Sequence, residues 1–309
     1  MKKYISKILL FFSIVVVVDF CFGIFGDYLQ VHAKSGDTRF VNDLVTKDCH
    51  DVLILGSSRA RHHYDAPMLS DSLSMDVCNA GFDGNGVILA YGLLKMMIDR
   101  CHPKLVLYDV EPTFDIQIYP SDHHGTRYLK FLKPYYKKPG IEEVFRDVSD
   151  EEWYKVQSGL IRYNGELISK ISDNNNIKVE PSVKRGYEPL KGMMNKNIKE
   201  EPSPIPTPTP ELDGLKLRHI EKIIDLAQSK NIPIALICSP KYGAKSSVIF
   251  LSVKEICSKN GVTFFDYYTD SYFLERSDLF KDPMHLNEVG AREYSKRVLV
   301  DMKSLLIGE

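Results

Sequence analysis

Three short stretches of the chain combine residue types that could do chemistry. Two serines, Ser57 and Ser58, directly follow Gly56. Residues 79–84 read Asn-Ala-Gly-Phe-Asp-Gly, and residues 282–285 read Asp-Pro-Met-His. A serine hydroxyl, an imidazole and a carboxylate can act together in catalysis. The imidazole, oriented by the carboxylate, takes the serine proton and makes the serine a nucleophile.

The spacing within these stretches suits that chemistry, although no stretch is specific alone. Gly84 could present a bare N–H to a ligand oxygen, because glycine has no Cβ to block the approach. Asp282 and His285 are three residues apart, so the carboxylate can hold one imidazole nitrogen while the other faces a nucleophile. Glycine and serine are also common in turns, and a lone histidine is more often structural. The elements that position the stretches must therefore decide whether they act together.

These elements alternate between strands and helices. Short apolar runs predict buried strands at residues 51–56, 75–79, 104–110, 232–238 and 262–266. Helical patterns of apolar residues occupy residues 65–73, 87–99, 215–230, 246–260 and 288–306. Such alternation predicts an α/β fold, a flavodoxin-like three-layer sandwich with a five-stranded parallel sheet in the strand order 2-1-3-4-5.

The three stretches follow strands of this predicted sheet. The serine turn comes after the first strand, the glycine loop after the second, and residues 282–285 after the last. Ligands of open parallel sheets bind beyond the carboxyl ends of the strands. The sequence therefore predicts that all three stretches meet at one edge of the sheet.

In this order the stretches resemble the motifs of the SGNH/GDSL hydrolase family, over residues 51–110 and 232–306. The turn after the first strand looks like the family's Gly-Asp-Ser block, which implies Ser58 as nucleophile and Ser57 in place of the aspartate. The glycine loop resembles the second block, so the N–H groups of Ser58 and Gly84 would hold the oxyanion. Residues 282–285 resemble the final block, which implies Asp282 and His285 as the other catalytic residues.

At one motif this chain departs from the family pattern. After the third strand the family has Gly-x-Asn-Asp, whose Asn donates to the oxyanion. In this chain Thr113 falls at about that position, so its hydroxyl is the candidate third donor. Losing one such donor costs about 2.7–4 kcal/mol of transition-state stabilisation, so either another group donates or catalysis is weaker.

The resemblance implies a serine esterase or acyl-transferring enzyme that acts on an O-acylated carbohydrate, a cell-surface polymer or a small ester. With Ser-Ser in the first motif and an apolar N-terminus, the chain resembles the exported proteins of this family that act in acylation of cell-surface polymers. Neither a metal nor an organic cofactor is needed for this chemistry. The alternative is a catalytically silent protein of the same fold that binds glycan or assembles a surface-polymer complex.

The N-terminus predicts a single membrane helix. Lys2, Lys3 and Lys7 precede a nearly apolar stretch at residues 8–25, which as a helix spans about 27 Å. The basic flank favours a cytoplasmic N-terminus and an exported remainder. Asp19 interrupts the stretch, and a central Asp costs about 2.5–3.5 kcal/mol on insertion scales. The alternative is a cleaved signal peptide and a secreted protein.

The rest of the chain divides into a predicted stalk and one catalytic domain. Residues 1–25 form the anchor or signal, residues 26–48 a polar stalk, and residues 49–309 the hydrolase-like domain with an insertion at about residues 111–213. Within this insertion, the proline-rich residues 202–210 are expected to form a mobile surface loop or a lid over the strand ends.

Charge and the remaining polar residues exclude several functions. Forty basic residues balance 41 acidic ones, which leaves no basic field for nucleic acid. The adjacent His123 and His124 do not form a metal pair, because neighbouring side chains point apart. Asp109 and Asp115 are interpreted as structural.

Two further sets of residues leave alternatives open. Residues 59–63 contain two arginines and two histidines, Arg59, Arg61, His62 and His63, which are expected to be exposed at a helix start unless one binds an anionic substrate. The six cysteines are too few and scattered for a disulfide scaffold. Cys49 and Cys101 precede the first and third strands and could be bridged if those strands are neighbours, or could stay unpaired.

Overall fold

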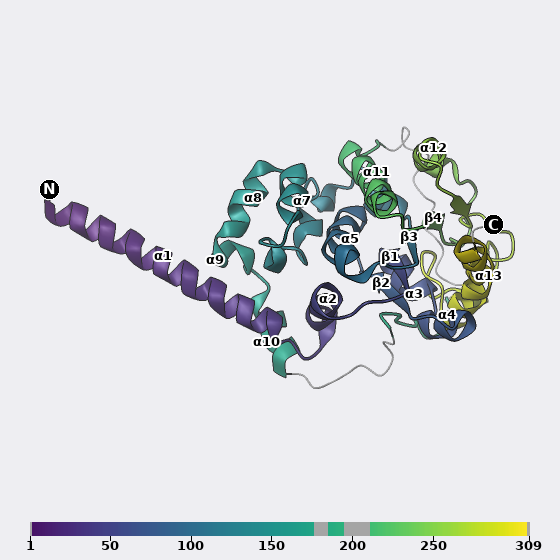
Figure 1. Ribbon diagram of the computed structural model, residues 1–309, viewed down its shortest axis with the longest axis horizontal. Helices are drawn as coiled ribbons and strands as arrows, with labels where there is room; N and C mark the ends of the chain where they lie inside the picture. The colour runs from purple at the N-terminus through teal and green to yellow at the C-terminus, as the bar shows by residue number, and fades with distance from the viewer. Residues whose placement is uncertain (1, 176–184, 195–210, 308–309) are drawn as a thin grey trace. The chain divides into compact units, whose positions relative to one another are not determined.

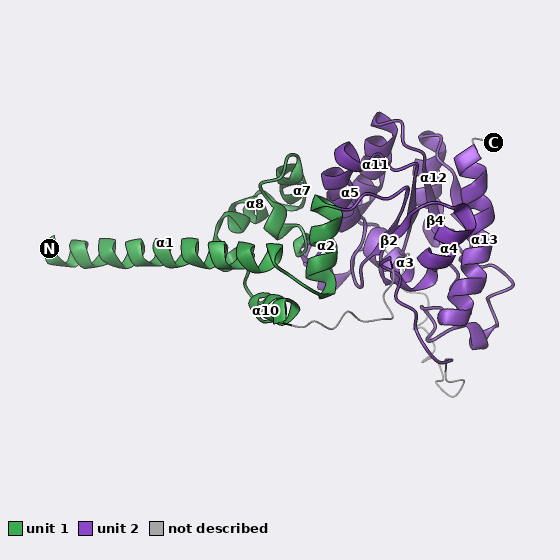
Figure 2. Cartoon of the chain, turned by 60° about the horizontal axis from the view of Figure 1, so that its bottom comes forward, with its two compact units in different colours: residues 1–47, 129–179 green, residues 48–128, 180–309 purple. Residues whose placement is uncertain are grey.

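The computed structural model describes residues 2–175, 185–194 and 211–307 (Figure 1). It divides into two compact units, shown in Figure 2: residues 1–47 with 129–179 form unit 1, and residues 48–128 with 180–309 form unit 2. The insertion predicted at residues 111–213 therefore contributes to both units. Its proline-rich part, residues 202–210, lies outside the described residues.

Unit 2 is built on a parallel sheet. In the described chain its strands are β1 (Val52–Gly56), β2 (Val77–Gly81), β3 (Leu105–Asp109), β4 (Ile234–Cys238) and β5 (Phe264–Asp266). Their order is β2-β1-β3-β4-β5, with every neighbouring pair parallel. The predicted fold class and strand order are confirmed. Gly56 lies opposite both Gly81 and Asp109, so these three strands end together.

Helices cover both faces of this sheet. The helices of unit 2 are α3 (Ser58–His63), α4 (Ala66–Leu73), α5 (Val87–Cys101), α6 (Pro112–Asp115), α11 (Gly214–Ser229), α12 (Leu251–Lys259) and α13 (Glu288–Ile307). Short 3-10 turns add η1 (Pro120–Asp122), η4 (Val248–Phe250) and η5 (Ser277–Leu279), and η2 (Thr126–Leu129) ends at the unit boundary. On one face, Val52, Ile54 and Leu107 pack with Leu69 of α4 and Val298 of α13. Alternate strand residues face the other way, and there α5 and α11 pack together (Figure 1).

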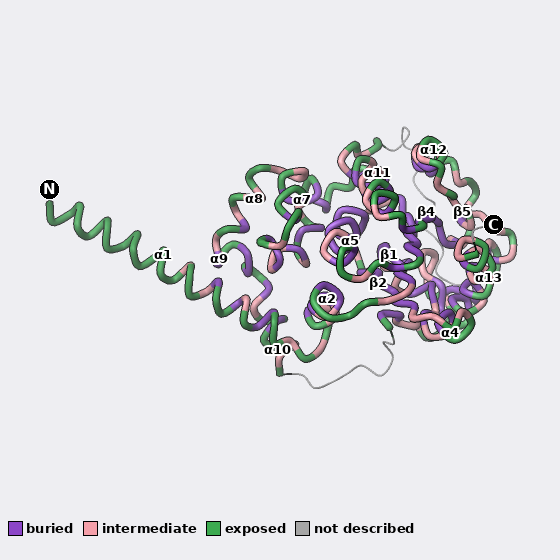
Figure 3. The backbone as a smooth tube through the Cα atoms, in the orientation of Figure 1, coloured by how far each residue is buried: buried purple, intermediate pink, exposed green. Residues whose placement is uncertain are grey.

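Unit 1 is helical. It contains α1 (Lys2–Val31), α2 (Gly36–Thr46), α7 (Ile141–Val148), α8 (Asp150–Gln157), α9 (Gly159–Arg162), α10 (Leu167–Asn175) and the 3-10 turn η3 (Lys133–Tyr135). Helix α1 has a stretch of 18 residues with mean hydropathy 2.8, of which only 6% is buried. Figure 3 shows this exposure along the N-terminal part of α1. Its length and composition suffice to cross a membrane.

The segment expected to be a polar stalk is helical in the structure. Residues 26–48 contain the end of α1 and the whole of α2. Val41, Leu44 and Val45 recur at helical spacing and are buried. The apolar face of α2 is narrow and surrounded by polar residues, so the sequence of this segment reads as polar.

A disulfide joins Cys49 to Cys101, with their Cα atoms 4.9 Å apart. Both cysteines precede strands that the sheet places side by side, β1 and β3. The sequence left the bridge and the unpaired state open, and the neighbouring strands bring the two residues together. Disulfides persist in oxidising compartments, which bears on the location of unit 2.

Candidate active site

The turn after β1 presents Ser58 and conceals Ser57. Gly56 has φ +148°, and a Cβ there would lie 2.7 Å from the Asp109 carbonyl oxygen, so a larger residue would force the strands apart. The Ser57 hydroxyl is buried and accepts a hydrogen bond from the Arg59 N–H at 3.3 Å, which caps α3. Ser58 is only half-buried. Of the two serines, Ser58 has the accessible hydroxyl.

His285 connects Ser58 to Asp282. Its Nε2 lies 2.8 Å from the Ser58 Oγ, and its Nδ1 lies 3.0 Å from each carboxylate oxygen of Asp282. The geometry fits an Nδ1–H that donates to the carboxylate and an Nε2 that accepts the serine proton. The three residues come from opposite ends of the sequence, and the parallel sheet brings them to the same edge.

Asp282 is fixed by its own turn. Its Oδ1 accepts hydrogen bonds from the backbone N–H groups of Met284 at 2.8 Å and His285 at 2.9 Å. Burial alone would raise the pKa of Asp282, but the hydrogen bond and charge of His285 and these N–H groups hold it below its ordinary value. The carboxylate is therefore ionised at neutral pH and able to orient the imidazole.

His63 supports the backbone that carries His285. It is fully buried, and its Nε2 accepts a hydrogen bond from the Leu286 N–H at 3.0 Å, so the proton resides on Nδ1, 2.9 Å from the Ser239 Oγ. Burial, together with the nearby charge of Arg59, lowers the pKa of His63 well below its ordinary value. A neutral ring therefore ties α3 to the residue after His285.

His62 lies against His285 and against the glycine loop. The two rings are perpendicular, with centroids 5.7 Å apart. The Nδ1 of His62 lies 2.7 Å from the Glu188 carbonyl oxygen, and its Nε2 lies 3.2 Å from the Asp83 carboxylate. Burial alone would lower the pKa of His62, but the Asp83 carboxylate and the Glu188 carbonyl raise it above its ordinary value. With both ring nitrogens engaged, His62 thus holds the residue directly before Gly84.

The expectation that residues 59–63 are exposed is wrong for Arg59, His62 and His63. Arg59 is fully buried, and its guanidinium donates to the Ser239 hydroxyl and to the carbonyls of Ser239 and Pro240. Arg61 is only partly buried and pairs with Glu188 at 2.8 Å. The reason is that α3 packs against both β2 and α13, a tertiary contact that local pattern does not reveal.

The glycine loop approaches α3 closely. A Cβ on Gly81 would lie 2.4 Å from the Arg61 backbone nitrogen, so the loop and α3 can touch only through a glycine. Asn79 reinforces this contact, because its side-chain amide donates to the Ala60 carbonyl at 2.7 Å. Gly84 has φ +65°, and a Cβ there would lie 2.3 Å from a guanidinium nitrogen of Arg127. The oxyanion role of the Ser58 and Gly84 N–H groups stays a prediction.

Thr113 and the two predicted structural carboxylates lie near the end of β3. The Thr113 hydroxyl bonds to the Glu111 carboxylate, and its role as third oxyanion donor stays a prediction. Asp109 is buried and accepts a hydrogen bond from the Tyr64 hydroxyl; burial raises its pKa to about 6, although Arg59 opposes this. Asp115 accepts hydrogen bonds from the Tyr108 hydroxyl and two backbone N–H groups, and burial raises its pKa to about 7.

Within the described residues, no group of three or more His, Cys, Asp or Glu side chains is arranged to hold a metal ion. His123 and His124 both adopt positive φ, at 48° and 55°.

Solved structures similar to this chain carry names from ester chemistry and drug metabolism. An acetyl xylan esterase is 11% identical with a TM-score of 0.40, over 81% of this chain and 98% of its own. A protein from Streptococcus pneumonia, provisionally named a platelet activating factor, is 11% identical with a TM-score of 0.42, over 96% and 98%. A gut microbial diltiazem-metabolizing enzyme is 13% identical with a TM-score of 0.37, over 82% and 47%.

No protein-family model matches the chain, and no curated protein matches its sequence. Since the structural similarities are weak, the chemistry of this protein has to be judged from its own site.

Proposed function

We propose that this protein is a serine esterase or acyl-transferring enzyme of the SGNH type, with Ser58 as nucleophile, His285 as general base and Asp282 as the residue that orients the base. The observation that carries the proposal is the continuous hydrogen-bonded chain from the half-buried Ser58 hydroxyl through His285 to Asp282. Nucleophile, base and orienting carboxylate in this order are the arrangement that acyl transfer requires.

The proposed reaction proceeds in the following steps. As the Ser58 Oγ attacks an ester carbonyl, its proton passes to the Nε2 of His285, and Asp282 stabilises the imidazolium that forms. The N–H groups of Ser58 and Gly84 hold the oxyanion of the tetrahedral intermediate. The intermediate collapses to an acyl-enzyme when His285 returns the proton to the leaving alcohol. Water or an acceptor hydroxyl then attacks the acyl group, again with His285 as base, and Ser58 is restored.

An O-acylated carbohydrate or cell-surface polymer is the substrate class we propose, on the strength of the motif resemblance. Hydrolysis and transfer share every step up to the acyl-enzyme and differ only in the acceptor. The same fold without turnover, as a glycan-binding or assembly protein, is the second candidate, and the departure of the third motif at Thr113 favours it.

We also propose that α1 is an uncleaved membrane anchor with the rest of the chain on the exported side. The basic residues before the apolar stretch favour this orientation, and a disulfide in unit 2 suits an oxidising compartment. Retention is supported by packing within unit 1, where Gly23, Gly26, Leu29 and Gln30 of α1 are buried. Signal cleavage beyond them would remove part of the core of unit 1.

The full-length protein in detergent, assayed with small aryl acetates, tests the enzymatic proposal. We expect turnover by the wild type and none by Ser58→Ala, with unchanged thermal stability in both. Ser252→Ala is the matched control, because Ser252 lies on α12 and its hydroxyl makes no hydrogen bond within the described residues. A folded wild type without turnover on any ester favours the binding protein instead.

A further inference from the structure

The apolar stretch of α1 is joined to the rest of unit 1 at Asp19. This carboxylate accepts hydrogen bonds from the Ser158 hydroxyl and from the backbone N–H groups of Gly159 at 3.1 Å and Leu160 at 2.9 Å. A carboxylate in hydrocarbon is costly unless its hydrogen bonds are satisfied. The start of α9 supplies these hydrogen bonds, which explains how Asp19 can stand inside an apolar stretch.

The contact between α1 and α9 is made through backbone atoms. A Cβ on Gly159 would lie 2.5 Å from the Gly23 Cα and 2.4 Å from the Asp19 carbonyl oxygen. The two segments therefore lie at the same level along the axis of α1. Asp19 precedes Phe25, the end of the apolar stretch, by six residues, which is about 9 Å of helix. When residues 8–25 fill the hydrocarbon core, Leu160 lies inside it.

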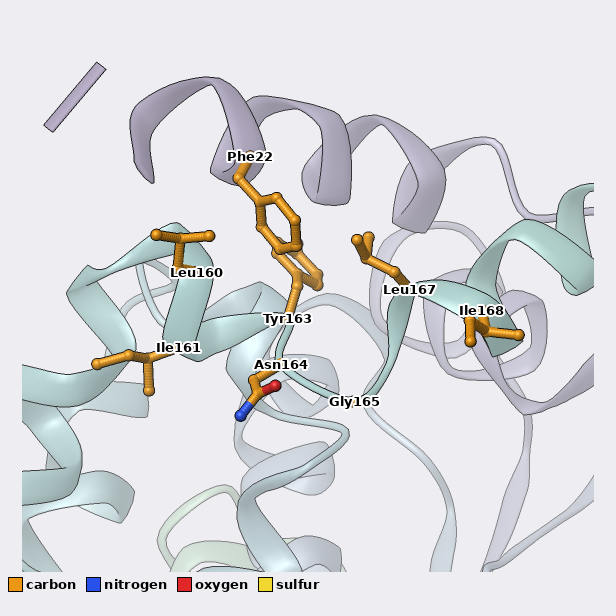
Figure 4. A pocket seen from close by; sticks show the side chains of 8 residues that line it. All are labelled: Phe22, Leu160, Ile161, Tyr163, Asn164, Gly165, Leu167 and Ile168. Carbon is orange, nitrogen blue, oxygen red and sulfur yellow. The ribbon is translucent and has the colours of Figure 1, made fainter. Parts of the chain in front are cut away.

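The surface beside this contact is largely apolar, with one exposed polar side chain at its edge, Asn164. Ile161 is 47% exposed and Ile168 is 85% exposed. Figure 4 shows these side chains around a groove of about 450 Å³, with Phe22 of α1 on one side and Leu160, Tyr163 and Leu167 on the other. An isoleucine this exposed beside an apolar groove is typical of a surface that meets another apolar phase.

We propose that Leu160 and Ile161 lie in the hydrocarbon of the exported leaflet, and that the groove beside Phe22 holds a phospholipid acyl chain. Tyr163 packs on Gly26 and hydrogen-bonds to Asp27, so it marks the outer boundary of the hydrocarbon. The inference rests on the proposed anchoring by α1. A lipid chain is the occupant because one wall of the groove is α1 itself, at a level where the helix's exposed faces also meet hydrocarbon. Part of unit 1 beside the anchor is then embedded in the membrane.

The single tryptophan of the chain, Trp153, makes a direct test practical. In a Trp153→Phe background, one new tryptophan reports the depth of its position through quenching by phosphatidylcholine that is brominated on its acyl chains. The full-length protein is reconstituted in vesicles with Ile161→Trp, and with Leu160→Trp as a second reporter should the first variant fail to fold. Phe12→Trp, in the apolar stretch, is the positive control, and Val300→Trp, 68% exposed on α13, is the control outside unit 1.

We expect brominated lipid to quench Ile161→Trp and Leu160→Trp as it quenches Phe12→Trp, while Val300→Trp keeps its emission. Reporters as bright as Val300→Trp beside a quenched Phe12→Trp would overturn the immersion and leave the anchoring intact. An unquenched Phe12→Trp would contradict the anchoring itself. Reporters that escape quenching only at high protein-to-lipid ratio would assign the groove to a second copy of the chain and overturn the lipid proposal.

Discussion

At the scale of single residues, the proposed chemistry depends on which nitrogen of each imidazole ring carries the proton. His285 needs a proton on Nδ1 so that its Nε2 can accept from Ser58, and Asp282 enforces this tautomer from 3.0 Å. His63 carries its proton on the same nitrogen but serves a structural contact, whereas both ring nitrogens of His62 lie against acceptors. Neighbouring acceptors and donors thus assign three histidines three different roles.

Replacing Asp282 by asparagine tests the tautomer argument. An Asp282→Asn side chain can donate to Nδ1 and favours the wrong tautomer, so we expect kcat to fall by about 10³–10⁴-fold while the fold persists. Steady-state kinetics on aryl acetates measures the loss. Asp278→Asn, an exposed aspartate paired with Arg276, is the matched control, and equal activity of the two variants would contradict the role of Asp282.

His62 predicts a pH dependence of stability. Its pKa is raised in the folded state, so it contributes stability that is complete below its unfolded pKa of about 6.5 and is lost as pH rises through the higher folded value. We expect the difference in Tm between wild type and His62→Gln to shrink as pH rises through this window. Thermal melts across that range measure it, and a constant difference would rule out a protonated His62.

At the scale of elements, the strands and their order follow from the sequence, whereas the burial of α3 does not. Each strand is a short apolar run bounded by polar residues, and parallel connection rules leave few orders open. Helix α3 carries Arg59, His62 and His63, residue types that are usually exposed. Their burial depends on partners such as Ser239 and Leu286, which are more than 170 positions away and which local pattern cannot reveal.

In the candidate site, too, some residues follow from the sequence and others do not. Ser58, Asp282 and His285 were predicted from motifs at strand ends, and the structure brings these three together. The supporting residues His62, His63 and Asp83 carry no motif of their own. The only sequence signal for them is adjacency, since the histidines follow Ser58 within one helix and Asp83 precedes Gly84.

The glycine loop gives a prediction with a matched control. Gly84 and Gly243 have nearly equal φ, +65° and +64°, but a Cβ on Gly243 would meet nothing within 4 Å. Alanine at either position costs about 1–2 kcal/mol of backbone strain. We expect only Gly84→Ala to lower kcat/KM for aryl acetates, because its methyl crowds the oxyanion and Arg127. Equal activity of the two variants would contradict an oxyanion role for this loop.

At the scale of the whole molecule, a disulfide joins the start of unit 2 to the end of α5. The bridge from Cys49 to Cys101 closes a loop of 52 residues. Removing a disulfide of this kind typically costs about 2–4 kcal/mol. We expect the double variant Cys49→Ser, Cys101→Ser to unfold at a lower urea concentration than the wild type. Its free energy of unfolding should be lower by that amount. Coincident urea transitions of both proteins under non-reducing conditions would show that the bridge does not form.

The two units also differ in how far sequence reasoning reaches. Unit 2 follows a regular alternation that can be read along the chain. Unit 1 is assembled from residues 1–47 and 129–179, so its core forms between segments that share no local pattern. The contact of Asp19 with residues 158–160 spans about 140 positions, and no periodicity in either segment predicts it.

Covalent labelling by a fluorophosphonate probe tests the central claim most directly. The probe reacts with a serine only where a neighbouring base activates the hydroxyl, and peptide mapping by mass spectrometry then identifies the labelled residue. The account predicts that the full-length protein is labelled at Ser58, that Ser57→Ala retains the label and that Ser58→Ala loses it. A label that survives Ser58→Ala and disappears in Ser57→Ala, or a folded wild type that takes no label, would contradict it.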